Sequence, residues 1–253
     1  MSELVLYDIP GKSLESKAWS PSTWRTRYAL NYKGLGYRTE WVEYPDIADL
    51  CKKIGAGPTG TNSDGSDYYS LPVLYDPSTD TVVPDSTDIA HYLDKTYPDT
   101  PPLFPPGTRG FHASFRTAFV AVLGRTHSLW KIVVLRACLN LSERSAAYFR
   151  RTREAEEEMT LEEIAPEGEV REKVFKDLEE DLAKMAKWYQ AAEDGPFIMG
   201  ETLCQADIMI AGQLIWARVL LGKDSKDWKR IAAMDSGFWG RFLENLAKYE
   251  QVE

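Results

Sequence analysis

The sequence has 253 residues, of which 43% are hydrophobic and 27% charged, an ordinary balance for a protein with its own core. The formal net charge of −9 argues against nucleic acid as a main partner, because binding to phosphate needs a basic face. The three cysteines are odd in number and far apart, and the three histidines show no metal-ligand spacing. We therefore expect no metal site, no disulfide framework and a reducing, cytoplasmic location.

The amino-terminal residues have no basic start followed by an apolar run, so the sequence predicts no signal peptide. No apolar stretch approaches the roughly 18–20 residues of a membrane span. We expect a protein without a membrane partner.

Residues 1–97 predict an α/β domain, because runs with strand periodicity alternate with runs of helical spacing. Glycines end both early helices, and a proline opens the third strand. The expected order is βαβαββα: strand 4–7, helix 24–32, strand 37–44, helix 45–54, a polar loop 55–69, strand 71–75, strand 81–83 and helix 86–97.

Residues 98–110 contain five prolines and predict an extended linker to a second domain, residues 111–253, in which we find no convincing strand. Apolar residues recur at helical spacing from Phe111 and again from Val174. Residues 208–221 are apolar on nearly all sides and predict a buried helix. The charged segment 151–173 reads as a solvated helix or loop.

The segment from Ser20 to Arg27 lies between the first strand and the first helix and reads S-x-x-x-W-R-x-R. With the βαβαββα order and the helices that follow, it resembles the serine-type classes of the glutathione transferase superfamily over essentially the whole chain. The resemblance implies a thioredoxin-like domain with a mixed four-stranded sheet, an all-α second domain, glutathione as co-substrate and a homodimer. It also implies that Ser20 is the catalytic residue.

The chemistry suits Ser20, because a hydroxyl that donates to a sulfur anion forms a charge-assisted bond worth about 1.5–3 kcal/mol. That lowers a thiol pKa by about one to two units, and a helix N-terminus adds to the effect. Two alternatives stay open. Ser20 is also a natural N-cap before Pro21, and Tyr7 on the first strand is a rival hydroxyl donor.

Two dipeptides complete the expected glutathione site. The resemblance implies a cis bond between Leu71 and Pro72 that leaves the Leu71 backbone free for the glutathione peptide, whereas a trans proline at a strand start is the ordinary alternative. Asp85 and Ser86 suit the γ-glutamyl end at a helix N-terminus, with a simple helix cap as the alternative.

A buried helix cap is expected before the apolar helix 208–221. The family carries Ser or Thr three residues before Asp207, and this chain has Cys204 there, which caps poorly. Thr202 with Gln205 also spells a capping box, which starts the helix two residues earlier. In either reading Cys204 is a buried small residue.

The second domain is expected to supply a pocket for an apolar electrophile, with Trp19, Phe115 and Phe119 as candidate lining residues. Within the superfamily the chain looks most like fungal etherase-like transferases, which implies aryl ethers, isothiocyanates or polyphenols as ligands. Two alternatives to catalysis remain: a ligandin-type carrier of aromatic compounds, and a scaffold protein that only uses the fold.

Overall fold

A mixed four-stranded sheet organises the first domain of the computed structural model, which describes residues 3–192 and 194–253. The strand order is β2-β1-β5-β6, with β1 parallel to β2 and antiparallel to β5, and β5 antiparallel to β6. The predicted thioredoxin-like fold is confirmed. The elements are β1 (Leu4–Asp8), α1 (Pro21–Lys33), β2 (Tyr37–Trp41), η1 (Tyr44–Asp46), α2 (Ile47–Ile54), β3 (Gly60–Thr61), β4 (Asp67–Tyr68), β5 (Val73–Asp76), β6 (Thr81–Pro84) and α3 (Ser86–Thr96).

Two local features differ from the sequence prediction. The second strand ends at Trp41 and not at Tyr44, because the chain turns into the short 3₁₀ helix η1 at Pro45. The polar loop 55–69 contains a small hairpin, β3–β4, in which the Thr59 N–H donates to the Tyr68 carbonyl at 2.8 Å. Both hairpin strands are exposed, so the sequence carries no hydrophobic alternation there.

The second domain is all helical in the described residues. The linker is not free: Leu103 is fully buried, its N–H donates to Asp94 at 3.0 Å, and its carbonyl accepts from the Gln205 N–H at 2.8 Å. The first helix begins at Arg109, two residues before the expected boundary. The helices are α4 (Arg109–Thr126), α5 (Ser128–Leu139), α6 (Glu143–Glu157), α7 (Leu161–Ile164), α8 (Glu169–Gln190), α9 (Gln205–Leu221), α10 (Lys226–Asn245) and η2 (Ala247–Tyr249).

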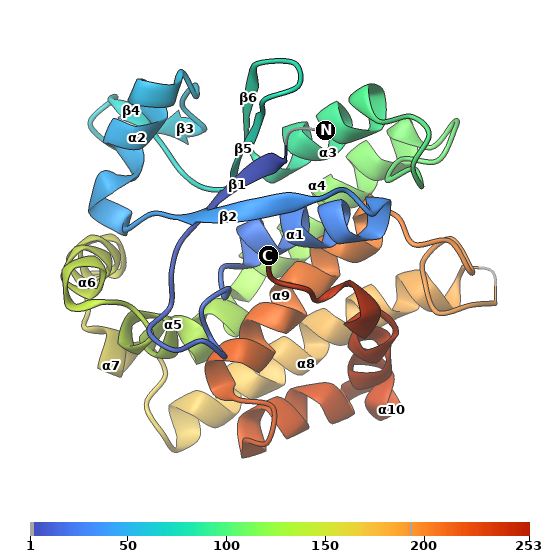
Figure 1. Cartoon of the computed structure of the whole chain (residues 1–253). Helices are drawn as coiled ribbons and strands as arrows, with labels where there is room; N and C mark the ends of the chain where they lie inside the picture. The colour runs from blue at the N-terminus through green and yellow to red at the C-terminus, as the bar shows by residue number, and fades with distance from the viewer. Residues whose placement is uncertain (1–2, 193) are drawn as a thin grey trace.

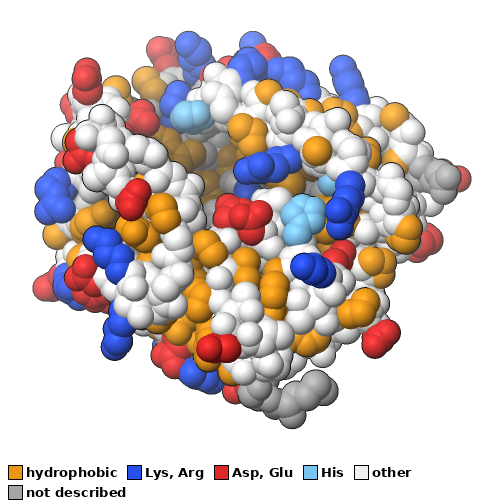
Figure 2. Space-filling view, turned by 90° about the horizontal axis from the view of Figure 1, so that it is seen from above, with side chains coloured by type: hydrophobic (Ala, Val, Ile, Leu, Met, Phe, Trp, Pro, Cys, Tyr) orange, Lys and Arg blue, Asp and Glu red, His pale blue; other side chains and the backbone are white. Residues whose placement is uncertain are grey.

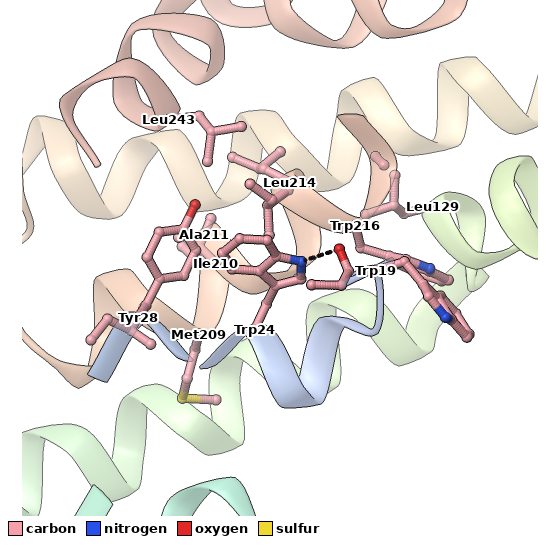
Figure 3. Close-up of a cluster of buried hydrophobic side chains, with 14 of the residues drawn as sticks. Trp19, Trp24, Tyr28, Leu129, Met209, Ile210, Ala211, Leu214, Trp216 and Leu243 are labelled. Atoms are coloured by element: carbon pink, nitrogen blue, oxygen red, sulfur yellow. Dashed lines mark hydrogen bonds between the residues drawn. The ribbon is translucent and has the colours of Figure 1, made fainter. Parts of the chain in front are cut away.

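Helix α1 joins the two domains, because it lies between the sheet and the buried helix α9 (Figure 1). Trp24 and Tyr28 of α1 pack beside Leu214 of α9 (Figure 3). Gly212 permits this close approach, since a Cβ there would lie 2.7 Å from the Pro21 carbonyl oxygen. Burial of each such large side chain stabilises the fold by about 1.5–3 kcal/mol.

The cap of α9 is built around Asp207. Its carboxylate accepts from the Cys204 N–H at 3.0 Å and from the Ile198 N–H at 2.9 Å, and Cys204 is the N-cap residue. The alternative start at Thr202 is therefore wrong. Burial raises the pKa of Asp207 to about 6 and raises the pKa of the Cys204 thiol, which is fully buried as expected.

Helices α4 and α5 meet at a 73° bend at His127, whose backbone is left-handed (φ 52°). Through the residues that the structure describes, no single helix is long and apolar enough to cross a bilayer, although this bent pair meets that criterion of length and composition. His127 and Leu129 at this bend line a cavity together with Pro21 and Arg25 of α1.

Candidate functional site

Ser20 lies at the N-cap position of α1, with Pro21 as the first helical residue. Its side chain does not cap the helix, and across residues 3–192 and 194–253 no protein group hydrogen-bonds its hydroxyl. Ser20 lines a cavity of about 540 Å³. The hydroxyl is thus available at the positive end of a helix, where negative charge is favoured.

Aromatic side chains form much of the wall of this first cavity. Trp19 is buried beside Ser20, and Tyr44 stacks on Tyr148 with ring centroids 6.0 Å apart. The face seen in Figure 2 is hollowed where hydrophobic side chains lie deep between charged ones. The aromatic residues of the wall are Trp19, Tyr44, Tyr68, Tyr69, Trp130, Tyr148, Phe149 and Trp216.

Two of these tryptophans keep unused hydrogen-bond donors. The indole nitrogens of Trp19 and Trp216 are buried and have no hydrogen-bond partner among the residues that the structure describes. Their side chains extend to the same side of the cluster in Figure 3, whereas Trp24 in the same cluster donates to the Ala18 carbonyl at 2.9 Å. An unpaired buried donor costs about 1–3 kcal/mol, so a bound acceptor would stabilise these two groups.

A second cavity, of about 450 Å³, adjoins the first and shares Pro21, Trp130 and Trp216 with it. Phe119 lines it, as expected for a pocket residue. Phe115 lines neither cavity, which corrects its placement: its ring packs against Phe119 and Trp188 in the interior, because it lies one turn earlier on α4.

Leu71 and Pro72 are joined by a cis peptide bond, as the resemblance implies. Leu71 also lines the first cavity with Ser20. Strand β5 starts only at Val73, and within the described chain neither the N–H nor the carbonyl of Leu71 forms a hydrogen bond. The Leu71 backbone can therefore pair with an extended peptide.

Asp85 and Ser86 form the start of α3. The Asp85 carboxylate accepts from the Thr87 N–H at 2.7 Å, so the cap expected as the alternative role is present. Asp85 has φ 69°, a conformation that costs a non-glycine residue about 1–3 kcal/mol. Ser86 is 5% exposed, and neither residue lines the two cavities.

The rival donor Tyr7 is placed elsewhere. It lies opposite Glu40 in the sheet and lines neither cavity. Burial raises the pKa of its hydroxyl, and the charge of Glu40 adds to the effect. The geometry therefore favours Ser20 over Tyr7 as the donor.

The two arginines of the W-R-x-R segment have different surroundings. Arg27 is fully buried and donates to Asp8 at 2.8 Å, which fixes α1 to β1. Arg25 lines the second cavity and has no ion pair in the part of the chain that the structure describes. The motif therefore serves both the fold and the site.

Sequence reasoning missed most of the aromatic wall. Trp130 and Trp216 lie on α5 and α9, where they read as core, and Tyr148 lies on α6. Arg153 lines both cavities although segment 151–173 reads as solvated. The only available signal was the density of aromatic residues, eight tryptophans and thirteen tyrosines.

Two further observations limit where the functional site can lie. A larger hollow of about 930 Å³ between α5, α9 and α10 contains none of the predicted site residues. The described residues contain no group of three or more His, Cys, Asp or Glu side chains placed to hold a metal ion. The chemistry of the site thus centres on the two adjoining cavities.

A thioredoxin-like domain followed by helices, with a free serine hydroxyl at the start of α1, defines the two-domain class of glutathione-binding proteins. The family comparisons agree. Residues 19–96 match the model of the glutathione S-transferase N-terminal domain, and residues 110–249 match that of the C-terminal domain. The chain belongs to the glutathione S-transferase family.

The chain is similar to several fungal proteins. The chain is 44% identical to glutathione transferase GSTFuA3 of Phanerochaete chrysosporium, with a TM-score of 0.93 over 100% of this chain and 99% of that one. It is 45% identical, with a TM-score of 0.94 and the same coverage, to a glutathione S-transferase of Ceriporiopsis subvermispora in complex with glutathione. The glutathione S-transferase-like protein ustS of Aspergillus flavus is 30% identical, over 93% of this chain and 87% of ustS.

Proposed function

We propose that the protein activates glutathione as a thiolate with the Ser20 hydroxyl and transfers it to apolar, aromatic electrophiles. The observation that carries this proposal is the free hydroxyl of Ser20, which lines an aromatic cavity at the start of α1. Serine acts as a hydrogen-bond donor to the sulfur, and the thiolate is the nucleophile that attacks the electrophilic carbon.

The magnitudes suffice for this role. A free thiol titrates near about 8.5, so only a few per cent is thiolate at neutral pH. One charge-assisted hydrogen bond contributes about 1.5–3 kcal/mol, and the helix N-terminus adds up to about 1 kcal/mol. Together they lower the thiol pKa by about one to two units or more, to near neutrality.

The rest of glutathione is placed by backbone groups and a helix start. The free N–H and carbonyl of Leu71, next to Pro72, pair with the cysteinyl backbone of the tripeptide. Ser86 and the N-terminus of α3 bind the γ-glutamyl carboxylate, and Asp85 attracts its ammonium group.

The aromatic walls select the second substrate. Aryl ethers, isothiocyanates and polyphenol-type compounds fit walls made of Trp19, Trp216 and Phe119, since aromatic pairs add about 0.5–1.5 kcal/mol beyond the burial of their area. Ether cleavage by the thiolate is part of this proposal, and so are a cytoplasmic location and a homodimer. Sedimentation that gives only monomer at micromolar concentration would contradict the dimer.

The test is Ser20→Ala with Ser22→Ala as a matched control, because Ser22 lines the same cavity two residues further along. Turnover of phenethyl isothiocyanate and the pH dependence of thiolate absorbance are measured for both. We expect Ser20→Ala to lower kcat/KM about ten-fold or more and to raise the thiol pKa by about one to two units, and Ser22→Ala to change little. Unchanged turnover and thiol pKa in Ser20→Ala would refute the assignment, and tight aromatic binding without turnover in the unmodified protein would indicate a carrier.

A further inference from the structure

Arg25 is a cation without a partner in the wall of the second cavity. In residues 3–192 and 194–253 no acceptor hydrogen-bonds its guanidinium, no carboxylate pairs with it, and its Nε is buried. Other arginines nearby are paired: Arg27 with Asp8, and Arg153 with Glu156. An unpaired and partly buried charge is costly, so this site is complementary to an anion.

Both apolar and charged side chains line the cavity around Arg25, and the charged ones include Glu156, which pairs with Arg153, and Glu157. The Arg25 guanidinium carbon lies 5.7 Å from the centre of the Phe119 ring, and Leu123 and Leu129 line the same cavity. Burial lowers the pKa of Arg25 to about 10, so the side chain stays charged at neutral pH. The charge of Asp85 acts on it from a distance without forming an ion pair, and the charge of Arg116 opposes that effect.

A second donor lies in the same wall. Trp216 is 6% exposed and lines the cavity, and no group in the described part of the chain hydrogen-bonds its indole nitrogen. A guanidinium and an indole N–H can only donate, so the ligand has to supply acceptors. The planar guanidinium also matches the two oxygens of a carboxylate better than a single acceptor.

We propose that the second cavity binds aromatic carboxylates, with Arg25 as the residue that selects the anionic group and the Phe119 side of the cavity as the seat of the ring. This inference rests on the proposed function in one respect: it takes the second cavity as the place where the second substrate binds. Glutathione also carries carboxylates, but Ser20 and Leu71 line the first cavity alone, and Arg25 lines the second alone. We therefore assign Arg25 to the second ligand, although the charge of Asp85, at the γ-glutamyl end of the proposed glutathione site, also acts on it.

The test compares two probes that differ in charge and hardly in shape, naphthalene-2-carboxylate and naphthalene-2-carboxamide. Calorimetry gives the ratio of their affinities for the unmodified protein and for Arg25→Met, Arg25→Lys and the control Arg116→Met. We expect the unmodified protein to prefer the carboxylate about ten-fold or more, the range of a charge-assisted hydrogen bond. Arg25→Met should bring the ratio near one, Arg25→Lys should keep part of the preference, and Arg116→Met should keep it because Arg116 is exposed and outside the cavity.

Equal affinities of the unmodified protein for the two probes would overturn the inference, and this measurement needs no variant to fold. A carboxylate preference that survives in folded Arg25→Met would overturn it too. Loss of glutathione affinity in Arg25→Met with an unchanged ratio would assign Arg25 to glutathione. The proposed function fails separately, if Ser20→Ala leaves the thiol pKa unchanged while the carboxylate preference persists.

Discussion

The buried ion pair between Asp8 and Arg27 gives the sharpest stability prediction, for the substitution Asp8→Asn. Both side chains are fully buried, and Arg27 Nη2 lies 2.8 Å from Asp8 Oδ2. The other carboxylate oxygen accepts from the Ile9 N–H. In Asp8→Asn the amide oxygen can still accept from Ile9, but the amide NH₂ then faces the Arg27 donor.

The remaining partners of Arg27 cannot replace the carboxylate. Its Nη1 donates to the Tyr37 hydroxyl at 3.1 Å and to the Thr39 hydroxyl at 3.2 Å, and both acceptors are neutral. Removal of one member of a buried pair costs about 3–5 kcal/mol, because an uncompensated charge stays in the interior. We therefore expect Asp8→Asn to lower the free energy of unfolding by about 3 kcal/mol or more.

The double variant Asp8→Asn/Arg27→Met removes the charge as well and should cost clearly less than the sum of the two single substitutions. Equilibrium urea unfolding, followed by circular dichroism and tryptophan fluorescence, measures all four proteins of the cycle. The reasoning is refuted if Asp8→Asn loses less than about 1 kcal/mol or if the two substitutions are additive.

Three further predictions concern buried titratable groups. Burial lowers the pKa of His112 to about 4, below its unfolded value of about 6.5, so the protein loses stability as the pH falls from neutral. In His112→Phe, the decrease in the free energy of unfolding between about pH 7 and pH 5 should be smaller by about 1–2 kcal/mol than in the unmodified protein. An equal decrease in both proteins would contradict this prediction. Burial raises the pKa of Cys51, Cys138 and Cys204, so a disulfide reagent should label the native protein far more slowly than the unfolded one, and one fast native thiol would contradict this. Cys204→Ser should raise the free energy of unfolding by about 0.5–1 kcal/mol in urea titrations, because serine is the better N-cap toward the N–H of Asp207, whereas a loss of similar size would show that packing of the sulfur dominates.

The fold could be predicted from the sequence, and the residues that we propose for glutathione could be chosen from it, because both depend on local signals. Strand and helix periodicities, glycine stops and the Pro21 start are properties of neighbouring residues. Ser20, Leu71 and Asp85 each sit at the end of one such element. A sequence that predicts where helices and strands begin therefore also predicts the positions of these three residues.

The aromatic wall could not be predicted in the same way, because it is assembled from elements far apart in the chain. Tyr44 meets Tyr148 only after the two domains pack, and Trp216 lies on a helix that is apolar on all sides. The helical spacing shared by Phe115 and Phe119 gives their common face but not the point where a cavity opens along it. Such choices depend on tertiary packing.

Because Gly212 of the second domain packs against the Pro21 carbonyl, the second domain helps to fix the position of Ser20 in the first domain. Gly212 lines neither cavity, yet it packs closely against Pro21, the residue after Ser20. A methyl group at position 212 would lie too close to the Pro21 carbonyl and displace the first turn of α1, which follows Ser20. Under the proposed function, this substitution would change the reactivity of glutathione through the position of the Ser20 hydroxyl.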